Sequence, residues 1–462
     1  MDARLAEDLA GLPGLLDATR KFAERALAGL DSRPVAGRVR PVTPESLPHK
    51  GIGLASALER FAERWEPGFS GSAGPRYLGF VTGGTTPAAL AGDWLTSAYD
   101  QNVVFAADSS ATDLERETIG WLRELFGLDS AFSGSFVSGA TTSNFVGLAI
   151  GREWLGEQAG ISVAQQGVSA IGEVHVLSGS PHSSSYKALS MTGIGRDRMR
   201  TVPVLDGREA VDVAALDAAL SALDGRPAIV IGNAGTVNTV DFDDLGAIAA
   251  LKARYPFWFH VDAAFGGFAA LSPEHAGLLD GLAEADSVCV DLHKWLNVPY
   301  DAAVQFSRRP DLQVAVFQNA APYLSVPADD PDFVHLTPES SRRLRALATW
   351  FSLSAYGREG HAEIVRRDIA LAHRLGERLA ELPGVRLLAP VRLNVVCFTL
   401  DGDVSAAARA IAATGETFVT PTVYAGQPGL RAAFSNWRTT ESDVDRMVAA
   451  IERAVTEPEA AR

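Results

Sequence analysis

The sequence predicts an α/β protein with a large, mostly parallel sheet and a smaller α+β domain after it. From about residue 77 to 340, helix-like segments alternate with short apolar runs, the clearest at 228–231, 257–261 and 283–291. That alternation is typical of βα units around a parallel sheet. Beyond residue 341 the pattern predicts a long helix over 342–382 that breaks near Tyr356 and Gly357, a strand at 393–398 and a terminal helix from Glu441.

The first 76 residues predict a helical segment that becomes irregular. Leucines 5, 9, 12, 15 and 16 form one apolar face, and prolines between Pro34 and Pro48 interrupt the pattern. This face must be covered, and a second subunit is as good a candidate as the rest of the chain. We therefore expect three parts: an N-terminal helical, dimer-packing segment (1–76), a large domain (77–340) and a small C-terminal domain (341–462). A polar, proline-rich stretch at about 325–341 is long enough to be a lid.

Composition excludes several classes of partner. The 462 residues carry a formal net charge of −15, with an isoelectric point near 5.1. Such a charge repels nucleic acid and anionic membranes, so we expect neither as a partner. The two cysteines, Cys289 and Cys397, lie in apolar stretches far apart in the sequence, which favours a reducing cytoplasm. The N-terminus lacks the continuous apolar segment of a signal peptide, so we do not expect secretion.

Lys294 and Asp262 are the most informative pair in the chain. Lys294 follows the apolar run at 283–291, just past the carboxyl end of a predicted buried strand, where open α/β sheets bind ligands. A lysine there can form a Schiff base, whereas the alternative, an ordinary surface lysine, is less favoured at this position. A buried aspartate such as Asp262 can keep a heteroaromatic nitrogen protonated. Together the two residues predict a site for pyridoxal 5'-phosphate, with no metal.

Four other positions fit the same chemistry, although each also has an ordinary explanation. Small and hydroxyl residues at 138–144 precede an apolar helix, which suits either a phosphate or a simple helix cap. His182 could stack on a cofactor ring or lie idle in solvent. Thr236 follows a predicted strand, in a motif that could equally be a glycine turn. His293 could donate to the phosphate or merely end a helix.

The order of these motifs resembles the group II pyridoxal-phosphate decarboxylases, which include the aromatic amino-acid, glutamate and histidine decarboxylases. The resemblance begins at 77–82, passes through 112–115 and continues beyond Lys294 to 342–345 and 430–431. It implies the fold-type I transferase architecture with a seven-stranded type of sheet. It also implies a homodimer whose active site is shared between subunits.

Carried over by position, the resemblance implies a role for each motif residue. Lys294 becomes the internal aldimine lysine, Asp262 the partner of the pyridine nitrogen, and His182 the ring-stacking base. The other implied contacts are to the phosphate (Ala140, Thr141, His293), the ring (Thr236, Ala264) and the substrate (Phe80, Thr82).

Two departures from the family pattern stand out. Asp291 and Leu292 replace the usual Asn-Pro before His-Lys, and Asp291 would repel a phosphate, so it should point elsewhere. The stretch between Leu324 and Arg342 holds no tyrosine, the residue that donates the proton in the animal enzymes. Its nearest occupants are Phe333, a candidate substrate contact, and His335. Of these two, only His335 has a pKa suited to proton donation near neutrality, so we expect it to supply the proton to the carbanion, with His182 as the alternative donor.

We therefore expect decarboxylation of an L-amino acid through an external aldimine and a quinonoid, with aromatic substrates favoured. Without the lid tyrosine, the same cofactor could instead support decarboxylative aldehyde synthesis, transamination or carbon–carbon lysis. A protein that binds the cofactor without turnover is the alternative of another class. The presence of Lys294, Asp262 and His182 together argues against it.

Overall fold

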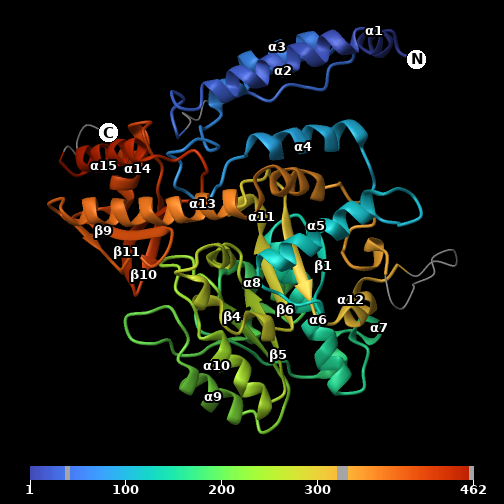
Figure 1. Ribbon diagram of the computed structural model, residues 1–462, viewed down its shortest axis with the longest axis vertical. Coiled ribbons are helices and arrows are strands. Elements are labelled where there is room, and N and C mark those ends of the chain that lie inside the picture. Colours follow the sequence, from blue (N-terminus) through green and yellow to red (C-terminus); the bar gives the residue numbers. More distant parts are fainter. Residues whose placement is uncertain (37–41, 320–330, 457–462) are drawn as a thin grey trace.

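The computed structural model describes residues 1–36, 42–319 and 331–456. Its larger sheet has seven strands in the order β1-β7-β6-β5-β4-β2-β3 (Figure 1). Strands β6, β5, β4, β2 and β3 are parallel, whereas β7 runs antiparallel to both β6 and β1. The predicted mostly parallel sheet is thus confirmed. The strands are β1 (Ser133–Val137), β2 (Val176–Ser178), β3 (Met199–Thr201), β4 (Ala228–Asn233), β5 (Phe257–Asp262), β6 (Ser287–Asp291) and β7 (Ala303–Ser307).

Helices cover the large sheet, and every residue of β4, β5 and β6 is buried. This explains why these strands read as continuous apolar runs instead of alternating ones. Helix α6 starts directly after the turn that follows β1 and packs on β5, β6 and β7. The helices of this part are α4 (Pro87–Tyr99), α5 (Ala111–Leu125), α6 (Ala140–Gln158), α7 (Val163–Gln166), α8 (Ser183–Met191), α9 (Val213–Ser221), α10 (Leu245–Ala250), α11 (Leu292–Trp295) and α12 (Pro310–Phe317).

The C-terminal part contains a second, antiparallel sheet in the order β10-β11-β9-β8. Helix α13 (Ala346–Ala380) leads into it and is kinked at Gly357, whose φ of 59° and ψ of −172° suit glycine alone. The predicted break near this residue is confirmed. The remaining elements are β8 (Val385–Leu387), β9 (Val395–Leu400), α14 (Val404–Ala413), β10 (Thr420–Tyr424), β11 (Gln427–Ala433) and α15 (Glu441–Thr456), which begins at the predicted Glu441.

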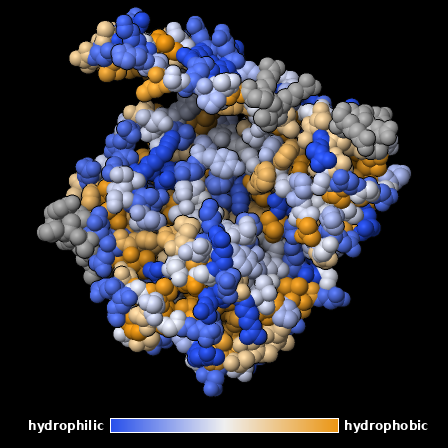
Figure 2. Space-filling view, turned by 180° about the vertical axis from the view of Figure 1, so that it is seen from behind, coloured by the Kyte–Doolittle hydropathy of each residue, from blue (hydrophilic) through white to orange (hydrophobic). Residues whose placement is uncertain are grey.

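The N-terminal helices α1 (Ala3–Ala10), α2 (Leu12–Ala28) and α3 (Leu54–Arg64) form an arm that projects from the body (Figure 1). None of the three contains a buried residue. Leucines 5, 9, 12 and 16 are all exposed on it. Figure 2 shows hydrophobic and hydrophilic residues side by side on this arm. The predicted apolar face exists, and within the described chain nothing buries it.

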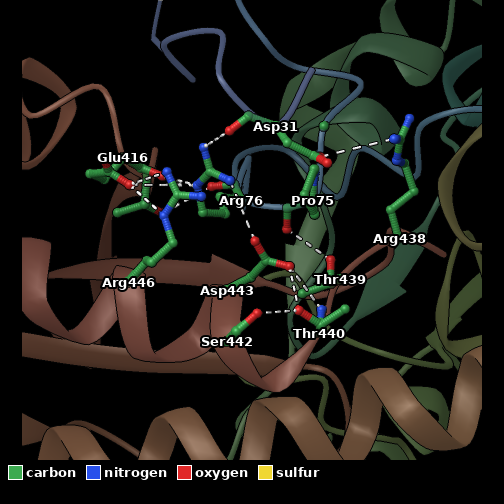
Figure 3. A network of polar contacts seen from close by, with 12 residues as sticks. Asp31, Pro75, Arg76, Glu416, Arg438, Thr439, Thr440, Ser442, Asp443 and Arg446 are labelled. Carbon is green, nitrogen blue, oxygen red and sulfur yellow. Dashed lines mark hydrogen bonds and ion pairs between the residues drawn. The ribbon is translucent and has the colours of Figure 1, made fainter. Parts of the chain in front are cut away.

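Arg76 ties the base of this arm to the small sheet domain (Figure 3). Its buried guanidinium donates to the backbone oxygens of Glu416 at 2.9 Å and Asp31 at 3.1 Å, and to Asp443 Oδ1 at 3.4 Å. A buried arginine requires such partners. This network joins segments about 340–370 positions apart, a link that no local sequence pattern predicts.

Some predicted boundaries were wrong. The strand expected at 283–291 starts only at Ser287, because residues 282–284 form a 3₁₀ turn after Gly281. The strand expected at 393–398 lies at 395–400. Of the predicted lid at 325–341, residues 325–330 lie outside the described residues. Among the described helices, none has the length and apolar character needed to cross a bilayer. The three-part division of the chain stays a prediction.

Candidate active site

A cavity of about 220 Å³ opens where β4, β5 and β6 end. Open α/β sheets bind ligands at this edge. The cavity brings together many of the residues predicted for the site, from Phe80 near the N-terminal part to Lys294 after β6. Its walls are formed by Phe80, Val81, Ala140, Ser180, His182, Asn233, Gly235, Thr236, Val237, Asp262, Ala264, Phe265, Lys294 and Arg431.

Lys294 lies on α11, the short helix that starts immediately after β6. Its Nζ is 3.3 Å from Oδ2 of Asp291 and 5.5 Å from the centroid of the Phe265 ring. The other oxygen of Asp291 lies 3.2 Å from His293 Nδ1, without the geometry of a hydrogen bond. Asp291 therefore lies between Lys294 and His293, and its avoidance of the phosphate stays a prediction.

Asp262 ends β5, and two N–H donors bind its carboxylate. Asn144 Nδ2 donates to Oδ2 at 2.9 Å, and the backbone N–H of Ala264 donates to Oδ1 at 3.1 Å. These two hydrogen bonds fix the orientation of the carboxylate. The arrangement suits a carboxylate that must face a protonated ring nitrogen.

His182 caps the N-terminus of α8 and faces the cavity. Its Nδ1 accepts from the backbone N–H of Ser184 at 3.2 Å and lies 2.8 Å from the Ser184 hydroxyl. His182 is exposed and lines the cavity, and desolvation by the surrounding protein lowers the pKa of its imidazole. A neutral ring at pH 7 can lie flat against an aromatic cofactor without a charge penalty.

The turn at 138–140 offers an anion site. Ala140 and Thr141 are the first residues of α6, whose unpaired N–H groups and dipole favour a negative charge. His293 lies beside this turn, because a Cβ on Gly139 would come within 3.5 Å of its Cε1. Desolvation lowers the pKa of His293, which favours a neutral ring that can donate one hydrogen bond. These residues fit a phosphate group.

Thr236 lines the cavity, but its hydroxyl already has partners. It donates to Glu209 Oε2 at 2.6 Å and accepts from the backbone N–H of Asp241 at 2.9 Å. The predicted contact between this hydroxyl and a ring substituent stays a prediction, and this bonding pattern does not favour it.

The segment that carries Phe80 adopts an unusual backbone at the cavity. Phe80 and Val81 have φ angles of 56° and 57°, although a β-branched residue such as Val81 rarely adopts positive φ. Strain of this kind often marks functional sites. The segment presses so closely on α11 that a side chain on Gly83 would overlap the Lys294 carbonyl. Thr82 is not among the wall residues, and its hydroxyl donates to Gly79 O at 3.1 Å.

Phe333 and His335 are not brought to the cavity of the single chain. The Phe333 ring is buried under the guanidinium of Arg342, 4.6 Å away, and that arginine forms a buried ion pair with Glu115 at 2.6 Å. His335 is also buried, and its Nδ1 accepts from the backbone N–H of Asn319 at 3.1 Å. Their proposed roles in substrate contact and proton donation stay predictions that this placement does not favour.

Three residues at or beside the cavity received no role from the sequence reasoning, although Arg431 and Asn144 lie in stretches that it named. Arg431, on β11, reaches the cavity wall from the small domain. Asn144, on α6, binds Asp262 across more than a hundred positions. Asn297 donates to the carbonyls of Gly83 and Ser435, both at 2.6 Å, and so holds α11 against both neighbouring segments. The sequence signals were the resemblance at 430–431 for Arg431 and the motif at 138–144 for Asn144, and neither states which partner the side chain meets.

Fold and site together define a lysine-dependent α/β enzyme whose cavity fits a phosphorylated, heteroaromatic cofactor. Residues 37–401 match the family model described as the pyridoxal-dependent decarboxylase conserved domain. The chain belongs to this family and is a pyridoxal-phosphate-dependent amino-acid decarboxylase.

Individual relatives agree with this assignment. The aromatic-L-amino-acid decarboxylase of Cavia porcellus is 30% identical over 401 residues, covering 81% of this chain and 82% of the relative. Tryptophan decarboxylase 1 of Oryza sativa subsp. japonica is 26% identical, covering 85% and 82%. A crystal structure of the Oryza sativa enzyme TDC with pyridoxal phosphate and tryptamine superposes with a TM-score of 0.90 at 24% identity, over 97% of this chain and 98% of that one. This last likeness shows the fold.

Proposed function

We propose that this protein decarboxylates an aromatic L-amino acid, with Lys294, Asp262, His182 and Arg431 as the central residues. The observation that carries the proposal is Arg431. It is 7% exposed, lines the cavity and donates one hydrogen bond to the Val237 carbonyl at 2.6 Å. Its Nε has no hydrogen-bond partner, and within the described part of the chain it forms no ion pair. A buried guanidinium of this kind is suited to an incoming carboxylate.

Each side chain at the site would have a separate role toward the cofactor or the substrate. Lys294 would anchor it covalently, the start of α6 and His293 would hold its phosphate, and Asp262 would keep its ring nitrogen protonated. When bound, pyridoxal phosphate supplies the electron sink for the bond that breaks. Arg431 would orient the substrate carboxylate, and His182 would cover the ring face opposite Ala264.

The cavity supports an aromatic substrate over an acidic one. Phe80, Val81, Val237 and Phe265 give it an apolar wall. Among the wall residues, the only lysine and arginine are Lys294 and Arg431. Since these are needed for the cofactor and for the α-carboxylate, a second carboxylate such as that of glutamate would be buried without a partner. Two of the relatives are also named for aromatic amino acids or tryptophan.

The test is to incubate the purified holoenzyme with a mixture of amino acids and identify what is consumed and released. Consumption of tryptophan, tyrosine or phenylalanine with release of CO₂ and the matching amine supports the proposal. Consumption of glutamate or aspartate in preference would overturn the aromatic assignment. If no amino acid is consumed, the protein is instead a cofactor-binding scaffold.

A second candidate, decarboxylative aldehyde synthesis, rests on the absence of tyrosine between Leu324 and Arg342. Here the amino acid, O₂ and water would give the aldehyde, CO₂, ammonia and hydrogen peroxide. The same incubation separates the two reactions, because only this one consumes O₂ and forms peroxide in equal amounts with CO₂. Transamination and carbon–carbon lysis would leave the carboxylate in a product and release no CO₂.

We further propose that the protein is a cytoplasmic homodimer in which the N-terminal arm of one subunit covers the other, with an active site shared between them. The exposed leucines of α1 and α2 support this, since a continuous apolar stripe is costly in water. Both cysteines are free and buried, which suits a reducing compartment. Light scattering should give twice the chain mass. Leu9→Glu together with Leu16→Glu should weaken the dimer, and a fully active monomer would contradict the proposal.

A further inference from the structure

A chain of hydrogen bonds runs through the protein behind Asp262. Trp258, His260 and Asp262 lie at alternate positions of β5 and therefore face the same side of the sheet, toward α6. His260 lies between Ser287 Oγ, 2.8 Å from its Nδ1, and Asn144 Oδ1, 2.8 Å from its Nε2. Trp258 Nε1 donates to the same Ser287 oxygen at 3.0 Å. All of these side chains are buried.

The hydrogen-bond donors and acceptors around His260 determine which of its ring nitrogens carries a proton. The indole of Trp258 can only donate, so the Ser287 oxygen accepts there and its own proton is free to go to His260 Nδ1. At the other end, the Asp262 carboxylate accepts from Asn144 Nδ2, which leaves the amide oxygen facing His260. The Asn144 oxygen requires a proton on His260 Nε2, and burial, which lowers the pKa of His260 to about 4, keeps the ring neutral, so Nδ1 accepts from the Ser287 hydroxyl.

Asn144 also connects to the other side of the cofactor site. The second proton of its amide points to Ser184 Oγ at 3.1 Å, and that hydroxyl lies 2.8 Å from His182 Nδ1. The backbone N–H of Ser184 also donates to this nitrogen at 3.2 Å. His182 Nδ1 is therefore an acceptor, and the proton of the neutral ring lies on Nε2. The Asn144 amide thus donates directly to Asp262 and, through the Ser184 hydroxyl, is linked to His182.

Helix α6 is shaped to accommodate this chain. A Cβ on Gly147 would lie 2.7 Å from the His260 ring, and one on Gly151 would lie 2.7 Å from the Trp258 ring. The two glycines stand one helical turn apart, so they allow the helix to lie directly on both rings. A fully satisfied buried polar network of this type favours one arrangement and rigidifies it.

We propose that Asn144 is a positioning residue that acts on both faces of the site. Held by His260, its amide fixes the Asp262 carboxylate, and it also holds the Ser184 hydroxyl that faces Nδ1 of His182, next to the Ser184 backbone N–H that donates to the same nitrogen. This inference rests on the roles proposed above for Asp262 and His182. It adds that Asn144, Ser184 and His260 set the charge and proton positions of those two groups.

The first test measures proton positions without cofactor. In ¹⁵N-histidine-labelled apoprotein at pH 7, His260 and His182 should both give the ¹⁵N shifts of the neutral Nε2–H form. Their signals are assigned with the His260→Gln and His182→Gln variants. An Nδ1–H tautomer at either residue, or a doubly protonated His260, would overturn the proposal. This result does not depend on turnover, so it stands apart from the proposed decarboxylation, which fails only if no CO₂ is released.

The second test separates the effect of Asn144 on Asp262 from its effect on His182 through Ser184. Asn144→Leu should shift the ¹⁵N signals of His182, because the Ser184 hydroxyl loses its partner, and should also move the ring-nitrogen shift of bound ¹⁵N-labelled pyridoxal phosphate toward the unprotonated value. Ser184→Ala should change the His182 signal alone, and Ser190→Ala, on the exposed end of α8, should change neither. We expect kcat of Asn144→Leu to fall about 10–100-fold, as for other residues that orient a ligand.

If Asn144→Leu does not fold, Gly147→Ala gives the same information, because it displaces the His260 ring without removing a polar group. Its ring-nitrogen shift should then move in the same direction. If the ring-nitrogen shift of the cofactor and the ¹⁵N signals of His182 are both unchanged in the folded variants, Asn144 has only a structural role.

Discussion

The amino group of Lys294 lies 3.3 Å from Oδ2 of Asp291, and the two side chains are only 17% and 4% exposed. Free lysine therefore has an anionic neighbour in the protein interior, where opposite charges interact more strongly than in water. Covalent attachment of the cofactor changes the group that Asp291 faces. The ion pair between Lys294 and Asp291 therefore contributes to the stability of the cofactor-free protein, and covalent attachment of the cofactor to Lys294 would alter it.

Lys294 should be the point of covalent attachment. Borohydride reduction of the holoenzyme should fix the cofactor on the peptide that contains residue 294, as measured by mass spectrometry. Lys294→Ala should lose both this label and turnover while still retaining the cofactor through its phosphate contacts. Lys187→Ala, an exposed lysine on α8, is the matched control and should behave as the wild type. A label on any other peptide would exclude the assignment.

The ion pair should appear in a double-mutant cycle on the apoprotein. Lys294→Ala leaves Asp291 buried without its cation and should lower the free energy of unfolding by roughly 1–3 kcal/mol. The double variant with Asp291→Asn should recover much of this loss, because no uncompensated charge remains. Denaturant unfolding at fixed protein concentration measures both. Strict additivity of the two single changes would show that the residues do not interact.

Asp262→Asn should keep the shape of the site and remove the charge that faces the ring nitrogen. We expect kcat to fall by at least about a hundredfold, since loss of one preorganised electrostatic partner usually costs 10²–10³. The melting temperature should change little. Asp280→Asn removes an exposed carboxylate and serves as the control for net charge. Near-normal turnover in Asp262→Asn would mean that the reaction does not need a protonated ring.

Arg431→Met should mainly weaken substrate binding. Loss of a charge-assisted pair with the substrate carboxylate should raise KM by roughly 10–100-fold, which corresponds to about 1.5–3 kcal/mol. Arg386→Met, an exposed position on β8, should leave KM unchanged. Binding of the amine product, which lacks the carboxylate, should be nearly the same in Arg431→Met and wild type. If amine binding falls equally, Arg431 holds the site together without contacting the carboxylate.

Stability should fall on acidification because of His361. Desolvation lowers the pKa of this buried imidazole to about 4, from an ordinary value of 6.5. Between pH 6.5 and 4 the unfolded chain therefore binds a proton that the folded chain does not, so the free energy of unfolding falls as pH falls. The contribution is at most roughly 3 kcal/mol.

Comparison with His361→Gln isolates this effect from other groups. Burial raises the pKa of Asp243 to about 6, which acts in the opposite direction over part of the same range. Both proteins retain Asp243. The free energy of unfolding of the wild type, relative to that of His361→Gln, should therefore fall from pH 7 to pH 4. Parallel curves over this range would show that His361 does not titrate as described.

The sequence alone predicted the architecture wherever local pattern and burial coincide. Continuous apolar runs identified β4, β5 and β6, since strands covered on both faces need no polar side. The break in α13 was readable from Gly357, because few other residues tolerate its backbone angles. Boundaries were less accurate where a 3₁₀ turn carries the same apolar residues as a strand, as it does before Ser287.

Within the site, the sequence determined the residues whose chemistry is unusual in a local motif: Lys294, Asp262 and His182 all reach one cavity. Only the tertiary structure decided which partners they meet. Arg431 comes from the small domain, and Asn144 reaches Asp262 from another element 118 positions away. Likewise, only packing placed His335 and Phe333 in the interior instead of at the cavity. The physical reason is that motifs report local chemistry, whereas hydrogen-bond partners and burial depend on contacts between segments far apart in the chain.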